Sequence, residues 1–267
     1  MTMTLSEKHN KLKEILSDAG SAVIALSGGT DSSFLASVAS KVDGARFMAV
    51  TVNTPYMFAS EVSEAAEFCR SIGMQHREIT FGIPESVTGN PPERCYLCKT
   101  VVIKAIRKVA AEENIMTIFD GTNADDVNDY RPGMKALEEQ KVRSPLLEAG
   151  LTKEEIRALA RAAGLGISEK LSNSCLLTRF PHDTIITADE LRKAEKAEML
   201  LAKMGFTASR IRVHGDIARI ELRKEQLSGI LSGEVREKVV SGLKELGYRY
   251  ITIDLEGYRS GSMNKIS

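Results

Sequence analysis

The stretch that decides the fold is AVIALSGGTDSS, residues 22–33. Residues 22–26 form a short continuous apolar run that ends at a polar, glycine-containing segment. Such a run is typical of a strand buried on both faces of a parallel sheet. A helix is predicted from about Ser32 to Val42. The stretch therefore predicts a strand, a tight glycine loop and a helix, which together form the first unit of an α/β sheet.

The alternation of helix and strand continues outward from this stretch. We expect helices at residues 5–19, 61–72, 95–113 and 151–163, and strands at residues 47–52, 75–81 and 115–119. Thr152 and Glu155 form a capping box at the start of the helix at 151–163. The segment 82–94 contains Pro84, Pro91 and Pro92 and is predicted to be a long loop. This order of elements predicts an α/β fold with a doubly wound, mostly parallel sheet.

The pattern changes after about Phe180. Thr187 is predicted to cap a charged helix that continues to Met204. Two strands, 210–214 and 217–222, follow with a turn at 214–216, and then come two short helices and a last strand at 248–255. We therefore expect two domains, residues 1–180 and residues 181–267, of which the second is a smaller α+β domain.

The bulk composition limits the partners of the chain. Thirty-six basic side chains balance 36 acidic ones, so the net charge disfavours nucleic acid as a partner. No stretch approaches the roughly 18–20 consecutive apolar residues that span a bilayer, so no membrane role is expected. The charged N-terminus lacks the apolar core of a secretory signal. These features predict a cytoplasmic protein, in which cysteines are thiols, metal ligands or catalytic groups.

The glycine loop after the first strand is a candidate phosphate site. Glycines let backbone N–H groups surround a phosphate, and the N-terminus of the following helix favours negative charge. Asp31 is suited to hold Mg²⁺, and the two serine hydroxyls can donate hydrogen bonds. The spacing is neither that of a Walker A loop nor that of a dinucleotide fingerprint. A simple strand-to-helix turn is the alternative. The candidate ATP-binding residues in this loop are Ser27, Gly28, Gly29, Thr30, Asp31 and Ser32.

The cysteines suggest a second chemistry. Cys95 and Cys98 are three residues apart at the start of a predicted helix, where the helix dipole lowers thiol pKa. Cys175 lies in a polar loop beside Arg179, a cation that favours the thiolate. A zinc site normally needs four ligands, whereas a [4Fe-4S] cluster held by three cysteines leaves one iron open. Cys69 lies in an apolar helical pattern and is interpreted as a small buried hydrophobe. His182 and His214 are given no role.

The motifs resemble those of known families. SGGTDSS after a first strand resembles the PP-loop ATP pyrophosphatases, whose fold is of the adenine nucleotide alpha hydrolase type. Within that group, four further blocks are similar to the LarE sulfur transferases: DGTNADD (120–126), DYRPG (129–133), RSPLLEAGLTK (143–153) and GYRSGS (257–262). The resemblance therefore extends over nearly the whole chain.

The LarE resemblance implies a function. Members of that family adenylate the carboxylates of a pyridinium biscarboxylate mononucleotide and replace AMP with sulfur, which yields the nickel-pincer nucleotide. One branch sacrifices the sulfur of a cysteine that matches Cys175, and another carries sulfide on a [4Fe-4S] cluster held by three cysteines. Because the chain has the CxxC pair, it resembles the cluster branch, with Cys95, Cys98 and Cys175 as ligands. Gly121 and Asp125 are also candidate ATP-site residues. Asp125 and Asp126 are suited to bind Mg²⁺ or to shape the adenylation site, and a capped, solvated loop is the alternative.

The second domain carries the implied substrate site. Arg210 and Arg212 alternate on one predicted strand and match the family's substrate-phosphate arginines, with Arg179 and Glu198 beside them. A solvent-facing charged strand is the alternative. The implied cofactors are ATP, Mg²⁺ and a [4Fe-4S] cluster, and the expected partners are a small nucleotide substrate, a sulfide source and further copies of the chain. The rival functions are a tRNA thiolase and a nucleotide-binding regulator without catalysis.

Overall fold

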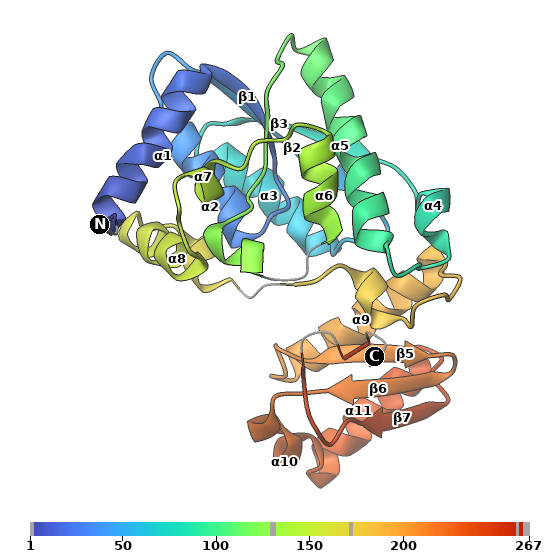
Figure 1. Cartoon of the computed structure of the whole chain (residues 1–267). Coiled ribbons are helices and arrows are strands. Elements are labelled where there is room, and N and C mark those ends of the chain that lie inside the picture. Colours follow the sequence, from blue (N-terminus) through green and yellow to red (C-terminus); the bar gives the residue numbers. More distant parts are fainter. Residues whose placement is uncertain (1–2, 129–131, 171–172, 260–261, 264–267) are drawn as a thin grey trace. The chain divides into compact units, whose positions relative to one another are not determined.

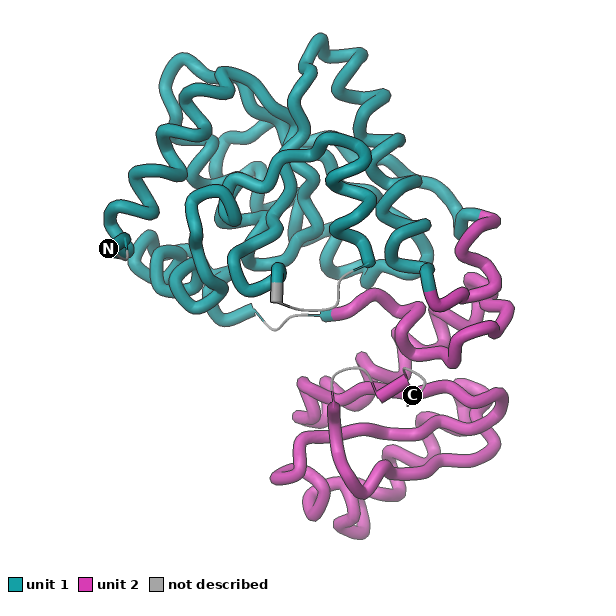
Figure 2. Tube along the Cα trace, in the orientation of Figure 1, with its two compact units in different colours: residues 1–84, 93–173 teal, residues 85–92, 174–267 magenta. Residues whose placement is uncertain are grey.

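The structure is a computed structural model that describes residues 3–128, 132–170, 173–259 and 262–263. Residues 129–131 and 260–261, which belong to motifs quoted above, and residues 171–172 lie outside this range. The chain divides into two compact units (Figure 2). The first contains residues 1–84 and 93–173, and the second contains residues 85–92 and 174–267. The main part of the second unit begins at Ser174, a few residues before the boundary expected at 180–181, and the second unit also contains residues 85–92, which were expected in the first domain.

The first unit is built on a parallel sheet (Figure 1). Within the described residues, its strands are β1 (Ser21–Ala25), β2 (Arg46–Asn53), β3 (Gln75–Thr80) and the short β4 (Ile118–Phe119). Their order is β3-β2-β1-β4, and every neighbouring pair is parallel. The chain moves from β1 to β2 and β3 on one side and then crosses to β4 on the other. The switch point of the sheet therefore lies between the carboxyl ends of β1 and β4, where open α/β sheets bind ligands.

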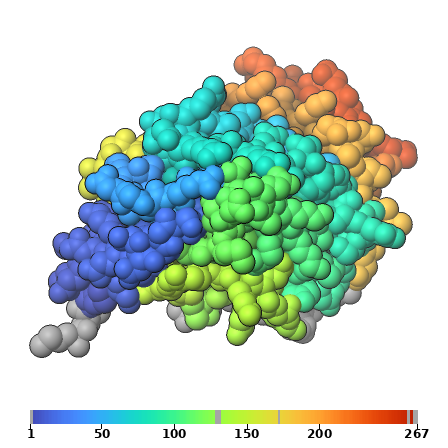
Figure 3. Space-filling model, turned by 90° about the horizontal axis from the view of Figure 1, so that it is seen from above, coloured from blue at the N-terminus to red at the C-terminus, as the bar shows by residue number. Residues whose placement is uncertain are grey.

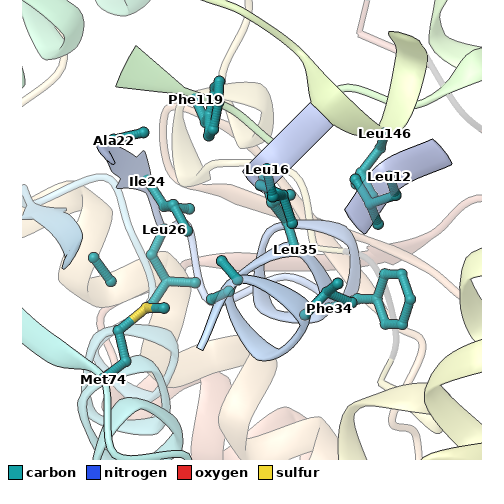
Figure 4. Close-up of a cluster of buried hydrophobic side chains, with 14 of the residues drawn as sticks. Leu12, Leu16, Ala22, Ile24, Leu26, Phe34, Leu35, Met74, Phe119 and Leu146 are labelled. Atoms are coloured by element: carbon teal, nitrogen blue, oxygen red, sulfur yellow. The ribbon is translucent and has the colours of Figure 1, made fainter. Parts of the chain in front are cut away.

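Helices cover both faces of this sheet, and the residues of β1 alternate between the two cores. Ala22 and Ile24 join one core together with α1 (Leu5–Ala19), α2 (Thr30–Ala39), α3 (Ala59–Ser71), α7 (Pro145–Glu148) and α8 (Lys153–Ala162). Val23 joins the other with α5 (Arg94–Glu112) and α6 (Pro132–Glu139). Figure 4 shows part of the first core, in which Leu12, Leu16 and Leu35 pack in one cluster with residues of β1. Figure 3 shows the surface that α1 forms, in blue. The predicted doubly wound fold is confirmed.

The second unit contains a smaller sheet and its helices. β5 (Arg210–His214) and β6 (Ile217–Glu221) form the predicted antiparallel hairpin, and β6 pairs in parallel with β7 (Tyr250–Ile253). Gly215 in the turn has φ of 58°, a conformation that glycine adopts without steric cost. Contacts join α9 (Ala188–Lys203) to β5, and α11 (Gly233–Glu245) to both α9 and β7. The predicted cap of α9 by Thr187 is present.

Three expectations about elements need correction. The segment 82–94 is not all loop, because α4 (Glu85–Thr88) forms between its prolines and buries Val87. Prolines bound this helix without removing any hydrogen bond inside it. Between β6 and β7, the expected two short helices are the short turns η4 (Lys224–Gln226) and α10 (Leu227–Ile230) followed by the full-length α11. Helices α6 and α7 were not expected. None of the described helices is long and apolar enough to cross a membrane.

Candidate active site

The loop between β1 and α2 has the conformation that a phosphate site requires. Gly28 has φ of 76°, and a Cβ atom there would lie 2.7 Å from the carbonyl oxygen of Glu61, so only glycine fits. The hydroxyl groups of Ser27 and Ser32 lie 3.1 Å apart, and the Gly29 amide donates to Ser27 Oγ at 3.3 Å. Gly29 is also the N-cap of α2 and has no side chain to cover the first-turn amides. Those amides have no partner within the helix and favour an anion.

A second loop packs directly against this helix start. Gly121 follows β4, and a Cβ atom there would lie 2.7 Å from the amide nitrogen of Ser32 and 2.9 Å from its Cα. The contact is between two backbones, which explains the glycine at position 121. The switch point of the sheet therefore brings together the phosphate loop and the DGTNADD segment.

Asp31 lies at this junction, in the first turn of α2. Its Oδ2 accepts a hydrogen bond from Asn123 Nδ2 at 3.0 Å, and Lys153 Nζ is 3.9 Å away. Its Oδ1 is buried and has no hydrogen-bond partner among the described residues. Burial raises the pKa of Asp31 above its usual value, although Lys153 and the Asn123 hydrogen bond oppose the shift. A cation bound at Oδ1 would give this oxygen the polar partner that it lacks among the described residues.

The neighbouring acidic residues are already used within the fold. Asp125 Oδ2 accepts from the Lys153 amide at 2.8 Å at the start of α8, and Asp126 Oδ2 accepts from the Asn123 amide at 3.1 Å. No group of three or more histidine, cysteine or acidic side chains able to hold a metal occurs within the described residues. The position nevertheless fits Mg²⁺, because this ion usually keeps several waters and binds one or two carboxylates together with substrate phosphates. Asp31, whose Oδ1 has no hydrogen-bond partner among the described residues, is the carboxylate best placed for it.

Cys95 lies in the first turn of α5 and Cys98 in the second, in the first unit. Cys95 is exposed, and Cys98 is partly buried with its Sγ 3.3 Å from the Tyr56 hydroxyl. The expectation of a lowered thiol pKa is wrong for Cys98. Burial raises its pKa, and this effect outweighs the Tyr56 hydrogen bond and the charge of Lys99. Cys69 is fully buried and burial raises its pKa to about 11, which confirms it as an inert core residue.

Cys175 lies in the second unit with the predicted substrate residues. It is half-buried and is the N-cap of η3 (Leu176–Arg179). Arg210 and Arg212 on β5 are 7% and 4% exposed, so the alternative of a solvent-facing charged strand is wrong. Arg210 stacks over the Tyr258 ring, with 5.4 Å from its guanidinium carbon to the ring centroid. Burial lowers the pKa of Arg210, and the nearby charge of Arg179 adds to this effect.

Comparison with known proteins agrees with this architecture. The asparagine synthase family matches residues 13–165, a range that contains the parallel sheet. The pyridinium-3,5-bisthiocarboxylic acid mononucleotide synthase of Lactiplantibacillus plantarum is 34% identical over 264 residues, which cover 98% of this chain and 95% of that enzyme. The chain belongs to the LarE family of PP-loop sulfur transferases.

Other relatives show how the similarity is distributed. An uncharacterized protein of Synechocystis sp. is 34% identical over 98% of both chains. One subunit of the glutamine-hydrolyzing GMP synthase of Archaeoglobus fulgidus is 31% identical over only 61% of this chain and 58% of its own length. Similarity of 34% identity over 98% of this chain is therefore found with the LarE enzyme and with the Synechocystis protein, whereas the GMP synthase subunit of Pyrococcus abyssi aligns over 97% of this chain at 28% identity. Membership of this family confirms the predicted class, an ATP-dependent enzyme that transfers sulfur.

Lys170 is a candidate site residue that was not expected from the sequence. Its Nζ donates to the Gly28 carbonyl at 2.8 Å and also pairs with Glu64. This cation therefore lies against the phosphate loop, although the loop lacks the lysine of a Walker A motif. Nothing in the local sequence marks it, because it lies 142 positions from Gly28 and only the fold brings them together.

We expect Lys170→Met to weaken ATP binding by about tenfold, because it removes a charge-assisted hydrogen bond to the loop. Isothermal titration calorimetry with ATP and Mg²⁺ measures the effect. Lys108→Met removes an equivalent charge from an exposed position on α5 and is the matched control. Equal ATP affinity in the two variants would mean that Lys170 only links the loop to Glu64 structurally and does not contribute to ATP binding.

Proposed function

We propose that this chain is an ATP-dependent sulfur transferase that adenylates a carboxylate of pyridinium-3,5-biscarboxylic acid mononucleotide and replaces AMP with sulfur. The main support is a phosphate loop at the switch point of the sheet, in a chain that aligns over 98% of its length with the bisthiocarboxylic acid mononucleotide synthase. A loop of amides and hydroxyls suits such chemistry, because positioning and charge stabilisation dominate it.

The first step is adenylation in the first unit. A carboxylate oxygen of the substrate attacks the α-phosphorus of ATP, and the bond from that phosphorus to the oxygen bridging to the β-phosphate breaks. Pyrophosphate leaves and an acyl-adenylate forms. The loop at 27–32 holds the polyphosphate with its amides and hydroxyls, while Lys170 supplies positive charge. Mg²⁺ held with the help of Asp31 supplies further charge neutralisation when it is bound.

The second step transfers sulfur to the activated carboxyl carbon. Sulfur attacks that carbon and AMP leaves with the bonding electrons, giving a thiocarboxylate. If Cys175 supplies its own sulfur, its thiolate forms a thioester, and β-elimination then breaks the Cβ–S bond. That elimination removes the Cα proton and leaves dehydroalanine at position 175, so no external reductant is required.

We propose Cys95, Cys98 and Cys175 as ligands of a [4Fe-4S] cluster. This proposal depends on the chemistry of the three thiols, since thiolates are the usual ligands of such clusters. The cluster would supply an open iron that carries the transferred sulfide. Cytoplasmic location, a homo-oligomer and an external sulfide source belong to the same proposal.

One experiment tests both sulfur sources. Protein reconstituted anaerobically with iron and sulfide is mixed with ATP, Mg²⁺ and the biscarboxylate mononucleotide, and pyrophosphate, AMP and thiocarboxylate are measured. We expect all three products, about four irons per chain, and an intact Cys175 by mass spectrometry after several turnovers. Dehydroalanine at 175 would instead identify the cysteine as the donor, and absence of pyrophosphate release would contradict the function itself.

Cysteine variants distinguish the proposed cluster ligands from a cysteine that does not bind the cluster. Cys98→Ala is expected to lose most of the bound iron and the thiocarboxylate product, because a cluster deprived of one thiolate is poorly held. Cys69→Ala changes an inert core thiol in the same unit and is the matched control. Zinc in place of iron, or full iron content in Cys98→Ala, would contradict the cluster.

A further inference from the structure

Arg179 in the second unit makes an unusually complete set of contacts within the chain. Its side chain is 0% exposed. Its Nε and Nη2 donate to the two carboxylate oxygens of Glu198, at 2.8 and 2.9 Å. Its Nη1 donates to the hydroxyl groups of Ser174 and Thr178, at 2.7 and 2.8 Å. All three nitrogens therefore donate to protein atoms, and the guanidinium presents no surface to a substrate phosphate.

These contacts converge on the segment that carries Cys175. The Thr178 hydroxyl accepts from Arg179 and donates to the Cys175 carbonyl at 2.8 Å. The Thr178 amide donates to the same carbonyl at 3.1 Å. The carbonyl of Cys175 thus accepts two hydrogen bonds from Thr178, whose hydroxyl is oriented by Arg179, and a longer one of 3.4 Å from Arg179 Nη1 itself.

The anchor of this arrangement is Glu198 on α9. Besides both bonds from Arg179, Glu198 Oε1 accepts from the Ile211 amide on β5 at 3.0 Å. A second buried ion pair, between Arg212 and Glu221, also holds Thr178. Arg212 pairs with Glu221, with 2.9 Å from Nε to Oε2, and its Nη1 donates to the Thr178 carbonyl at 2.9 Å. Thr178 is therefore held at its hydroxyl by one arginine and at its carbonyl by the other.

We infer that Thr178, Arg179 and Glu198 are positioning residues that hold the Cys175 segment for sulfur delivery, and that Arg179 and Glu198 are not ligands of the substrate phosphate. The inference rests on the proposed function for its kinetic consequence. Buried ion pairs contribute little net stability, but their directional bonds specify one geometry. A sulfur atom must approach a carboxyl carbon along a narrow path, so a loosened segment slows transfer without affecting adenylation.

Thr178→Val is the most selective test, because it removes the bridging hydroxyl while keeping the shape of the side chain and the Arg179–Glu198 pair. We expect thiocarboxylate formation to fall by about 10–100-fold. Pyrophosphate release and the KM for the mononucleotide should stay within about twofold of the parent, since this substitution changes neither the phosphate loop nor the side chains of Arg210 and Arg212. Arg179→Lys, which cannot bond to Glu198 bidentately, should show the same split. Arg192→Lys changes an exposed ion pair on α9 and is the control.

A second readout does not depend on turnover. Local opening of the segment exposes the half-buried thiol, so alkylation of Cys175 by iodoacetamide, followed by mass spectrometry of its peptide, should be faster in both variants than in the control. An unchanged alkylation rate in both variants overturns the inference. If the variants instead have a raised KM for the mononucleotide and release pyrophosphate proportionately more slowly, these residues bind the substrate and the positioning role is wrong. If the parent releases no pyrophosphate, the proposed function fails, and the alkylation rates still decide the positioning role.

Discussion

Replacing Gly121 by alanine is expected to reduce ATP-dependent activity by about a hundredfold and to destabilise the protein by roughly 1–3 kcal/mol. The new Cβ atom would lie 2.7 Å from the Ser32 amide nitrogen and 2.9 Å from its Cα, so a backbone has to move. The atoms that move are those of the first turn of α2, whose amides and hydroxyl are proposed to hold the polyphosphate. Pyrophosphate release measures the first effect, and thermal unfolding measures the second.

Gly82→Ala separates this effect from the general cost of replacing a glycine. Gly82 is exposed in the same unit, and a Cβ atom there meets no other atom within 4 Å. We expect this control to keep its activity and its melting temperature. If Gly121→Ala loses stability but binds ATP with the affinity of the parent, the loop after β4 supports the fold and does not shape the nucleotide site.

The parts of the fold that local patterns determine were predictable. The buried strand β1, the glycine loop and the cap of α9 each depend on residues within a few positions of one another, so a short stretch of sequence carries the signal. The glycine at position 121 is visible in the DGTNADD motif, but the sequence does not show why a glycine is required there. It lies against Ser32, and only the order β3-β2-β1-β4 makes them neighbours.

The chemistry of the site was less predictable, because burial changes it. The CxxC pair suggested lowered thiol pKa values, yet burial raises the pKa of Cys98 and outweighs the lowering effect of the Tyr56 hydrogen bond. Arg179 was interpreted from the resemblance as a substrate ligand, and a linear sequence does not show that Glu198, 19 positions later, occupies two of its nitrogens. The structure of the second unit is what suggests a positioning role.

Asp31→Asn is expected to lower turnover by about a hundredfold or more while making the free protein more stable by roughly 0.5–2 kcal/mol at neutral pH. The carboxylate is buried with one oxygen that has no hydrogen-bond partner among the described residues, and burial raises its pKa. Asparagine can still accept the bond from Asn123 but carries no charge to desolvate. It also removes the proposed magnesium ligand, so the dependence of ATP binding on Mg²⁺ should weaken.

The pH dependence of this stability gain has a definite sign. Because the pKa of Asp31 is higher in the folded protein than in the unfolded chain, the folded state binds more protons between the two values. The cost of the buried carboxylate is therefore absent below the ordinary value of 3.8 and grows until the pH exceeds the folded pKa. The melting temperature of Asp31→Asn should exceed that of the parent more at neutral pH than at about pH 4.

Asp43→Asn removes the same charge from an exposed position and should change neither the melting temperature nor turnover. An Asp31→Asn protein that is less stable than this control at neutral pH would show that the ion pair with Lys153, at 3.9 Å, outweighs the desolvation of the carboxylate. Unchanged Mg²⁺ dependence would show that another group holds the metal. Higher stability together with lost turnover is expected if the carboxylate serves to bind a cation, since the bound ion would contact Oδ1, which has no hydrogen-bond partner among the described residues.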